Sequence, residues 1–399
     1  MFNFDSPVIC LKYFSEHRVI FIGTYKEIIF INESFELIDR MTVDSPVRTA
    51  VCRKDGTVYI GLSSMTQNPM LMLDASGVLR EIEYEDRRLI KRGFMVMDMC
   101  LDNDESLWIA TAGNSLLKYD GLALTDFNSN NSDVNDSVVL SVRPDTTGQG
   151  NIWFGTESKG FGILGMPDWN EKRGRYTLGP DMMQMMLPEY EFKRYWTTQH
   201  LNIGGTYTCG QVWDASDYEE RYEEILQAND QYEEVLDNYR GYDNSEDDGE
   251  YKGEQIALFS GQVKSIALDN KQRVWLGTIK SGIIRFQWNT ESIIYHSANF
   301  NLPDNDVYTI ITDDENRAWA GTDRGLIVID EKVIKVYNTD NSPIQCNEIR
   351  SILLLDNFVL LGYNAKGSNP FGYSGSNNCS LDVIPLADLD DTGEVVSQE

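Results

Sequence analysis

The stretch Val274-Trp275-Leu276-Gly277-Thr278 belongs to a short phrase that recurs seven times along the chain. Clear copies carry a tryptophan, and the weaker ones keep only the glycine; the copies are centred on Trp108, Trp153, Trp275, Trp319, Gly23, Gly61 and Gly362. An apolar anchor precedes each glycine position by 13 to 16 residues: Val8, Val47, Val96, Val139, Val263, Val307 and Ile349. A fixed period of about 40 residues with strand-like content is typical of a solenoid or a propeller.

The overall charge limits the partners of this chain. Its 399 residues include 63 acidic and 34 basic side chains, for a formal net charge of -29. Such a surface repels phosphate backbones and anionic lipid, so we expect neither nucleic acid nor membrane partners. No run of about 20 apolar residues predicts a transmembrane helix. The start, Met1 to Val8, lacks the basic and apolar segments of a signal peptide, which predicts a cytoplasmic location for the chain as written.

Six cysteines occur, and none forms a C-x-x-C pair. Cys10, Cys52 and Cys100 follow a repeat anchor by two to five residues, where an inner strand is expected. We therefore predict buried free thiols that behave as small hydrophobic groups. A disulfide framework or a zinc site is the alternative.

Each repeat reads as four short strands. In the copy that begins at Val307, the runs are 307–310, 318–322, 326–329 and 333–337, separated by Asp, Asn and Gly turn formers. Runs of β-formers between such turns are typical of hairpins. The aromatic side chain before the glycine is expected to pack one sheet on the next, and the glycine to leave room for that neighbouring ring.

The pattern V-x-x-I-x-x-D, then W-[IFL]-G-T, then G-[LI] before an aromatic resembles the two-component regulator propeller repeat. The resemblance implies an all-β, seven-bladed β-propeller of four-stranded blades, with residues 1–399 as a single propeller. It also implies a ligand-sensing part of bacterial hybrid sensor kinases, usually extracytoplasmic. Relatives are thought to bind carbohydrate, often an anionic oligosaccharide, on one propeller face.

The ring of blades has to close, because the terminal blades of an open ring would expose strand edges. The seventh repeat has only three predicted strands, and the acidic C-terminal tail, 385–399, reads as turn-like. In other copies the fourth strand ends with an aromatic residue or a histidine before the next anchor, and Phe2 and Phe4 precede Val8 at a shorter distance. We therefore predict that the N-terminus completes the last blade.

The regular spacing breaks once. Gly155 and Gly277 lie 122 residues apart, whereas the other intervals run from 38 to 49. We interpret 165–255 as an insertion between blades four and five. It contains a predicted helix at about 217–240 and an acidic linker at 241–254. One apolar-aromatic stripe runs along the helix: Tyr218, Tyr222, Ile225, Tyr232, Leu236 and Tyr239. This stripe either packs on the propeller or binds a protein partner.

Cationic residues recur between the second and third strands of the repeats. These loops should point to one propeller face, and they carry Lys26, Asn114, Lys159, Lys280, Arg324 and Lys366. Tyr25, Phe371 and Tyr373 lie in the same loops and could stack on a sugar. Cations in register on so acidic a chain predict a ligand-binding mouth for anions. The alternative is that they are ordinary exposed turn residues.

Catalytic patterns are scarce. The three histidines, His17, His200 and His296, have no metal-ligand spacing, and no P-loop or dinucleotide fingerprint occurs. We therefore assign no catalytic residue, metal or cofactor. The sequence favours a non-catalytic, sensor-like recognition module for a carbohydrate-like ligand or a protein partner. The alternatives are a cytoplasmic interaction scaffold that uses the acidic helix, and a propeller glycoside hydrolase or lyase.

Overall fold

The computed structural model describes residues 6–66, 68–84, 93–129, 131, 132, 134, 136–145, 150–164, 262–286, 293–331, 333–363, 381–390 and 392–396. The predicted insertion, with its helix and linker, lies outside these residues, as do residues 1–5 and the loop at 364–380.

The described strands form seven antiparallel sheets, numbered here as blades 1 to 7 along the chain. Blades 1 to 3 have four strands each: β1 (Val8–Phe14), β2 (Val19–Thr24), β3 (Glu27–Asn32), β4 (Leu37–Thr42); β5 (Val47–Cys52), β6 (Val58–Leu62), β7 (Met70–Leu73), β8 (Leu79–Glu81); β9 (Met95–Leu101), β10 (Leu107–Ala112), β11 (Leu116–Tyr119), β12 (Leu124–Phe127). Blade 4 has three described strands: β13 (Val139–Pro144), β14 (Ile152–Thr156) and β15 (Phe161–Leu164).

The remaining blades follow the same order. Blade 5 consists of β16 (Val263–Leu268), β17 (Val274–Thr278), β18 (Ile283–Phe286) and β19 (Ile293–Tyr295), followed by α5 (Ser297–Phe300). Blade 6 consists of β20 (Val307–Thr312), β21 (Ala318–Thr322), β22 (Leu326–Asp330) and β23 (Val333–Tyr337). Blade 7 consists of β24 (Ile349–Leu355), β25 (Phe358–Tyr363) and β26 (Leu381–Pro385); α6 (Leu386–Asp390) and β27 (Glu394–Val396) follow.

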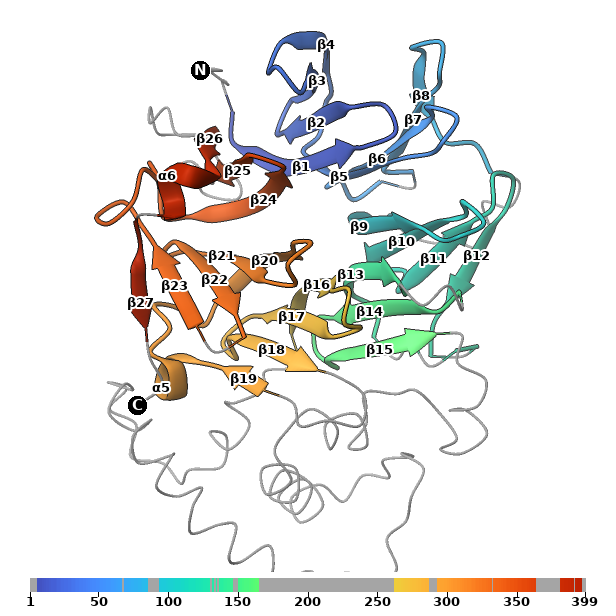
Figure 1. The fold of residues 1–399 in the computed structure, drawn as a ribbon. Helices are drawn as coiled ribbons and strands as arrows, with labels where there is room; N and C mark the ends of the chain where they lie inside the picture. The colour runs from blue at the N-terminus through green and yellow to red at the C-terminus, as the bar shows by residue number, and fades with distance from the viewer. Residues whose placement is uncertain are drawn as a thin grey trace, which may run out of the picture.

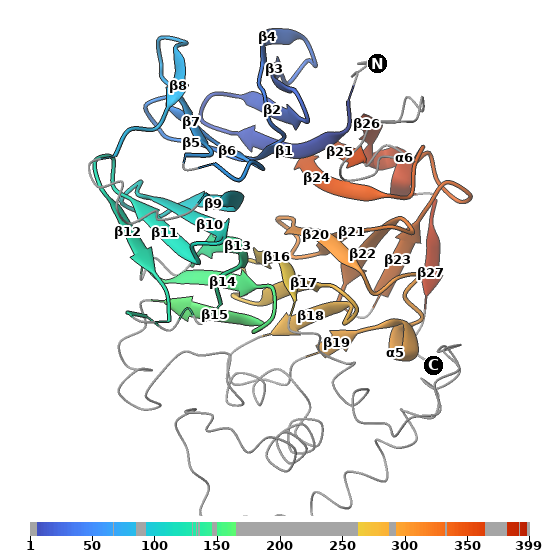
Figure 2. The same ribbon diagram turned by 180° about the vertical axis from the view of Figure 1, so that it is seen from behind.

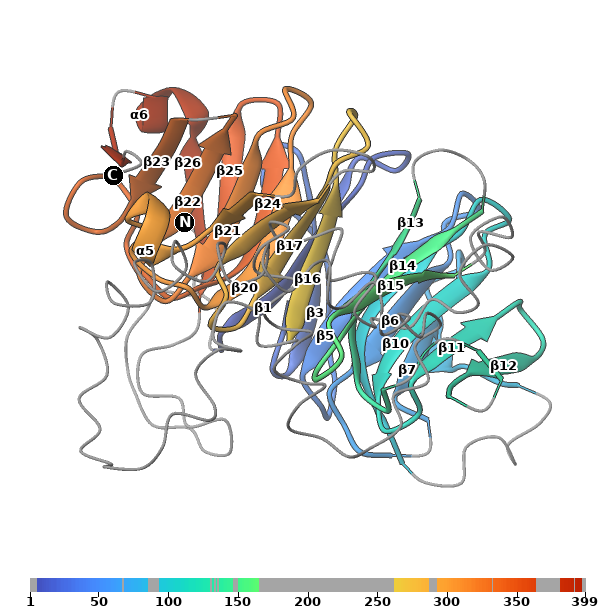
Figure 3. The same ribbon diagram turned by 90° about the horizontal axis from the view of Figure 1, so that it is seen from below.

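The blades stand in a ring around a common axis (Figures 1 and 2). The first strand of every blade is innermost, and each contacts the first strand of the next, in the order β1, β5, β9, β13, β16, β20, β24 and back to β1. β13 contacts β16 directly, so blades 4 and 5 are neighbours despite the 122-residue interval. The predicted seven-bladed β-propeller is confirmed, and Figure 3 shows it from the side.

The glycine of the repeated phrase is the contact point between blades. A β-carbon placed on Gly23, Gly155, Gly277, Gly321 or Gly362 would lie 2.6–2.9 Å from a γ-carbon of the next blade's anchor. The partner of Gly362 is Val8, so the same contact joins the last blade to the first. Our expectation that the glycine makes room for an aromatic ring was wrong: the side chain that occupies this space is the anchor valine or isoleucine.

The tryptophans of the phrase are part of the scaffold. Trp108, Trp153, Trp275 and Trp319 are all buried. The indole N–H groups of Trp108, Trp275 and Trp319 donate to Asp102, Asp269 and Asp313 at 2.8–3.0 Å. Each of these carboxylates also accepts backbone N–H groups of its own turn, so it fixes both the turn and the ring.

The described cysteines agree with the prediction of free thiols. Cys10, Cys52 and Cys100 are free thiols on inner strands. Burial raises the pKa of Cys10 and that of Cys52 to about 11, which keeps both thiols protonated at neutral pH. Cys209 and Cys379 lie outside the described residues.

The C-terminal tail differs from our expectation. It was expected to be turn-like, but it forms α6 and then β27, which pairs with β23 as a fifth strand of blade 6. Val396 packs against the blade 5 and 6 core, which stabilises the added strand. The predicted closing strand from Phe2 and Phe4 falls on residues 1–5 and stays a prediction. No helix among the described residues is long and apolar enough to cross a membrane.

A β-bulge occurs in every inner strand. The pairing register shifts by one residue directly after the anchor, as between Val47 and Thr49 and between Val263 and Ser265. The extra residue in each strand is the one that follows the anchor: Ile9, Arg48, Met97, Leu140, Lys264, Tyr308 and Arg350. Bulges re-aim a side chain, and here they turn one residue per blade toward the axis.

The contact between glycine and anchor yields a first prediction. Gly321→Ala should lower the free energy of unfolding by roughly 1–3 kcal/mol, because the new methyl group overlaps Ile349 of the next blade. Ile349→Ala removes the atoms that overlap the new methyl group, but it also loses the stabilisation from burying the isoleucine side chain. The double variant should therefore be more stable than the sum of the single losses predicts, by more than about 0.5 kcal/mol in denaturant titrations. Simple additivity would contradict the proposed contact.

Candidate functional site

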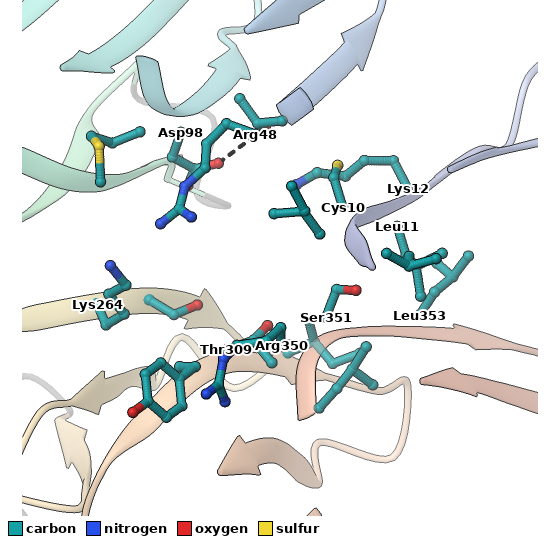
Figure 4. A pocket seen from close by; sticks show the side chains of 18 of the residues that line it. Cys10, Leu11, Lys12, Arg48, Asp98, Lys264, Thr309, Arg350, Ser351 and Leu353 are labelled. Atoms are coloured by element: carbon teal, nitrogen blue, oxygen red, sulfur yellow. Dashed lines mark hydrogen bonds between the residues drawn. The ribbon is translucent and has the colours of Figure 1, made fainter. Parts of the chain in front are cut away.

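A cavity of about 630 Å³ lies on the propeller axis. All seven inner strands line it, and each contributes its bulge residue. Figure 4 shows the side chains that surround it, with Arg48 and Lys264 reaching into the space between the strands. A cavity of this size is in the range of small-molecule binding sites.

The cavity lining is positively charged, in contrast to the chain as a whole. Its charged residues are five cations and one carboxylate: Lys12, Arg48, Arg143, Lys264, Arg350 and Asp98. The chain as a whole carries a net charge of -29. Field lines concentrate in a cavity with low-dielectric walls, so this local excess attracts anions despite the acidic surface.

Arg350 belongs to a fixed group at the edge of the cavity. Its guanidinium lies 3.7 Å from the ring centroid of Tyr308 and contacts Asp323 at 2.5 Å. The hydroxyl of Tyr308 donates to the other oxygen of Asp323 at 2.9 Å. Asp323 therefore balances the charge of Arg350 and holds both side chains in place.

Arg48 and Lys264 lack such a partner: neither forms an ion pair with another residue of the described part of the chain. Loss of hydration and the charges of Arg48 and Arg350 lower the pKa of Lys264 to about 7, although Glu157 opposes this shift. Loss of hydration also lowers the pKa of Arg48, against the attraction of Asp98. Neither cation is thus held in an ion pair, and the charges of Asp98 and Glu157 offset the loss of hydration only in part, so a bound anion would relieve the remaining cost.

Asp98 organises the second cationic side of the cavity. It accepts from Arg143, from the hydroxyl of Thr49 at 3.3 Å and from the backbone N–H of Val142 at 3.3 Å. Burial raises the pKa of Asp98, but the charges of Arg143 and Lys12 outweigh burial and hold the carboxyl below its ordinary value. Asp98 is therefore ionised, and Lys12 acts on it without forming an ion pair with a described residue.

The loops predicted from the sequence are built by the threonine of the repeated phrase. In blades 3 and 4 the hydroxyls of Thr111 and Thr156 donate to a backbone carbonyl across the loop, at 2.9 and 3.0 Å. The same oxygens accept the backbone N–H groups of Asn114 and Lys159 at 3.0 and 2.9 Å. Thr322 does the same for Arg324. The phrase thus shapes the turn that carries each predicted residue.

The structure places the predicted mouth residues as follows. Lys26, Lys159, Lys280 and Arg324 are exposed, and Asn114 is half-buried. Among the predicted residues that the structure describes, Tyr25 is the one that lines the axial cavity. Lys366, Phe371 and Tyr373 lie outside the described residues, as do Tyr218, Tyr222, Ile225, Tyr232, Leu236 and Tyr239 of the predicted helix.

These loops lie at the same end of the strands as the bulge cations, which are the three cations at bulge positions: Arg48, Lys264 and Arg350. Arg48 is near the start of β5, and the antiparallel register pairs Val47 with Leu62 at the end of β6. The loop between the second and third strands therefore begins beside the bulge residue in each blade. The predicted face is thus the face on which Arg48, Lys264 and Arg350 open.

The bulge cations themselves were missed by the sequence analysis. Arg48, Lys264 and Arg350 each stand one residue after a repeat anchor, in register with Ile9, Met97, Leu140 and Tyr308. This position could be read from the seven repeats, but the direction in which its side chain points depends on the bulge. In an unbulged strand, the residue after a buried anchor faces the opposite side of the sheet.

A second cavity, of about 380 Å³, provides a contrast. It lies along β26, where its lining includes Phe35, Leu381, Asp382 and Asp388 but no lysine or arginine. Burial lowers the pKa of His296 to about 4, so this ring is neutral at pH 7 and offers no positive charge to an anion. No cluster of metal-ligating side chains occurs among the described residues. The axial cavity is therefore the stronger candidate site.

The comparisons with known proteins agree with the repeat. A family model described as two component regulator propeller matches residues 301–324, which span the anchor Val307 and the phrase around Trp319. This match confirms the resemblance read from the sequence. No curated protein sequence matched the chain. The repeat match and the fold support a sensor-like propeller domain.

Solved structures with a TM-score above 0.5 show the same fold at low identity. Selenomethionine-substituted virginiamycin B lyase from Staphylococcus aureus has a TM-score of 0.55 and 10% identity, covering 99% of this chain and 96% of that one. U3-55K has a TM-score of 0.55 and 10% identity, covering 96% and 97%. The extracellular domain of a putative hybrid two component system from B. thetaiotaomicron has a TM-score of 0.47 and 16% identity. It covers 95% of this chain, which spans 40% of that chain's length.

The unpaired state of Lys264 has a consequence for stability. An unfolded lysine holds its proton up to a pH of about 10.4, whereas in the fold the pKa of Lys264 is about 7. The charge therefore destabilises the fold below pH 7, and this cost disappears as the pH rises toward 10. Lys264→Met should raise the melting temperature at pH 6 by about 2 °C or more, with a smaller gain at pH 9.5.

Lys54→Met serves as the control, since Lys54 is exposed on a turn at the opposite face. Its effect should be small and independent of pH. A melting temperature of Lys264→Met that is unchanged, or that rises equally at both pH values, would show that Lys264 is already solvated or paired.

Proposed function

We propose that this protein is a non-catalytic, sensor-like recognition module. It binds an anionic ligand in the axial cavity, at the end where Arg48 and Lys264 lie (the mouth of the axial channel). The observation that carries the proposal is the pair Arg48 and Lys264, which face one cavity and form no ion pair with another described residue. The ligand would approach from the face that carries Lys26, Lys159, Lys280 and Arg324.

The chemistry of the two cations suits an oxyanion. Arg48 offers a planar fork of donors that matches carboxylate, sulfate or phosphate, and Lys264 adds a compact ammonium. Hydrogen bonds between charged groups are shorter and stronger than neutral ones, and partial burial strengthens them further. A single anion between these side chains would restore charge balance at the mouth.

Aromatic residues at the same mouth favour a ring-containing ligand. Tyr25 and Tyr308 both line the cavity, and Arg350 holds the ring of Tyr308 in place. An acidic sugar offers both a charged group and an apolar ring face to such a surface. The resemblance to ligand-sensing propellers supports the same class, and we propose an acidic oligosaccharide as the ligand.

The test is calorimetric titration with acidic and neutral oligosaccharides of equal length. Arg48→Ala and Lys264→Ala should each weaken binding of the acidic ligand about tenfold or more, because each removes a charge-assisted hydrogen bond. Lys54→Ala, on the opposite face, is the matched control and should leave the affinity unchanged. If the neutral ligand binds as tightly as the acidic one, the proposal fails.

Binding should also depend on pH. The charged groups that act on Lys264 are Arg48, Arg350 and Glu157. Because an anion binds the ammonium form, affinity should rise as pH falls from 8 to 6, by up to about tenfold. Lys264→Arg should bind with little pH dependence over this range. An affinity of the wild type that does not change between pH 8 and pH 6 would remove Lys264 from the site.

The exposed loop cations make a separate prediction. Charge reversal by Lys280→Glu and Arg324→Glu should weaken binding of the acidic ligand, chiefly by slowing association, because these side chains are solvated and act at longer range. Stopped-flow association at low and high salt measures this effect. Association rates that equal those of the wild type at low salt would show that the loops take no part.

A further inference from the structure

We propose that the axial channel binds an extended ligand with two anionic groups, one at Arg48 and Lys264 and the other deeper, at Lys12 and Arg143. This inference rests on the proposed function, since it specifies the chemistry of the same ligand. It follows from the way in which the cations are spaced along the inner strands.

The five lining cations occupy two positions of the repeat. Arg48, Lys264 and Arg350 each follow the anchor by one residue, and they form the mouth tier. Lys12 and Arg143 each follow the anchor by four residues, and they form the inner tier. Three residues of strand separate the backbone positions of the two tiers by roughly 10 Å along the axis. No lining cation occupies a position between them.

Each tier retains positive charge after its internal pairs are counted. In the mouth tier, Asp323 balances Arg350 and leaves Arg48 and Lys264. In the inner tier, Asp98 balances Arg143 and leaves Lys12, which forms no ion pair with another described residue. The guanidinium of Arg143 has five N–H donors, so its pair with Asp98 leaves some of them for a ligand.

The wall between the tiers is polar. The residues two positions after the anchors that line the cavity include one carboxylate, which the guanidinium of Arg143 contacts: Cys10, Thr49, Asp98, Ser265, Thr309 and Ser351. The hydroxyl of Ser351 is buried and has no hydrogen-bond partner among the described residues. An unpaired buried hydroxyl is costly, and this one packs against Gly362 of the neighbouring strand.

The cavity volume agrees with a ligand larger than one oxyanion. Its 630 Å³ extends along all seven inner strands, from Pro7 and Val8 to Leu354. A single sulfate or carboxylate at the mouth would leave the inner tier unneutralised. A linear dianion of about 10 Å would neutralise both tiers at once, and the second contact would add affinity because it is intramolecular.

The experiment compares linear alkane disulfonates of increasing length with the matching monosulfonates, by calorimetric titration of the full chain. We expect the ratio of dianion to monoanion affinity to peak at a sulfonate separation of about 10 Å and to reach at least tenfold there. Lys12→Ala should bring this ratio close to one, whereas Lys12→Arg should restore it. Arg48→Ala should weaken both classes of probe. Thermal melts of each variant show that the fold is retained.

The outcomes separate this inference from the proposed function. If monosulfonates bind through Arg48 but the ratio stays near one at every length, the two-tier inference is overturned and the anion site stands. The same holds if Lys12→Ala keeps the wild-type ratio. If no sulfonate of either class binds, both proposals are overturned. A length optimum that Lys12→Ala abolishes supports both.

Discussion

The contact between a glycine of one blade and the anchor of the next is the constraint on which this structure depends. Six of the seven blades leave no space for a β-carbon at that glycine, because a valine or isoleucine of the neighbouring blade occupies it. The contact sets how closely adjacent sheets approach, and it recurs from Gly362 to Val8. Close approach buries the apolar faces on both sides, which is the main stabilising contribution to a ring of small sheets.

The same contact gives two neighbouring residues of each inner strand different roles. The anchor is held by the adjoining blade, and the bulge directly after it turns the next residue toward the axis. That next residue bears no packing load between blades, so it differs widely, from Ile9 and Met97 to Arg48 and Tyr308. The scaffold therefore repeats from blade to blade, while the residues that line the axial cavity vary. The chemistry of the candidate site comes from the residues that directly follow the anchors.

Local patterns explain why the fold was predictable and the site only partly so. Alternating strands, Asp-Gly turns and the phrase around Trp275 are short-range signals, and they predicted blades, their number and the interruption after Gly155. They also placed Lys159 and Arg324 on loops of one face. The direction of Lys264 depends on a bulge that no short-range pattern marks, and β27 pairs with a strand about 60 residues earlier. Both depend on which segments meet in the folded ring.

The three mouth cations belong to blades that do not touch one another. Arg48 comes from blade 2, Lys264 from blade 5 and Arg350 from blade 7. They face one cavity only because the ring is closed, so an opened ring would lose the proposed binding site. By mass action, a ligand that bridges them favours the closed circle over any state in which blades 7 and 1 have parted. A bound ligand would then make the ring more resistant to opening between blades 7 and 1, away from the atoms that the ligand contacts.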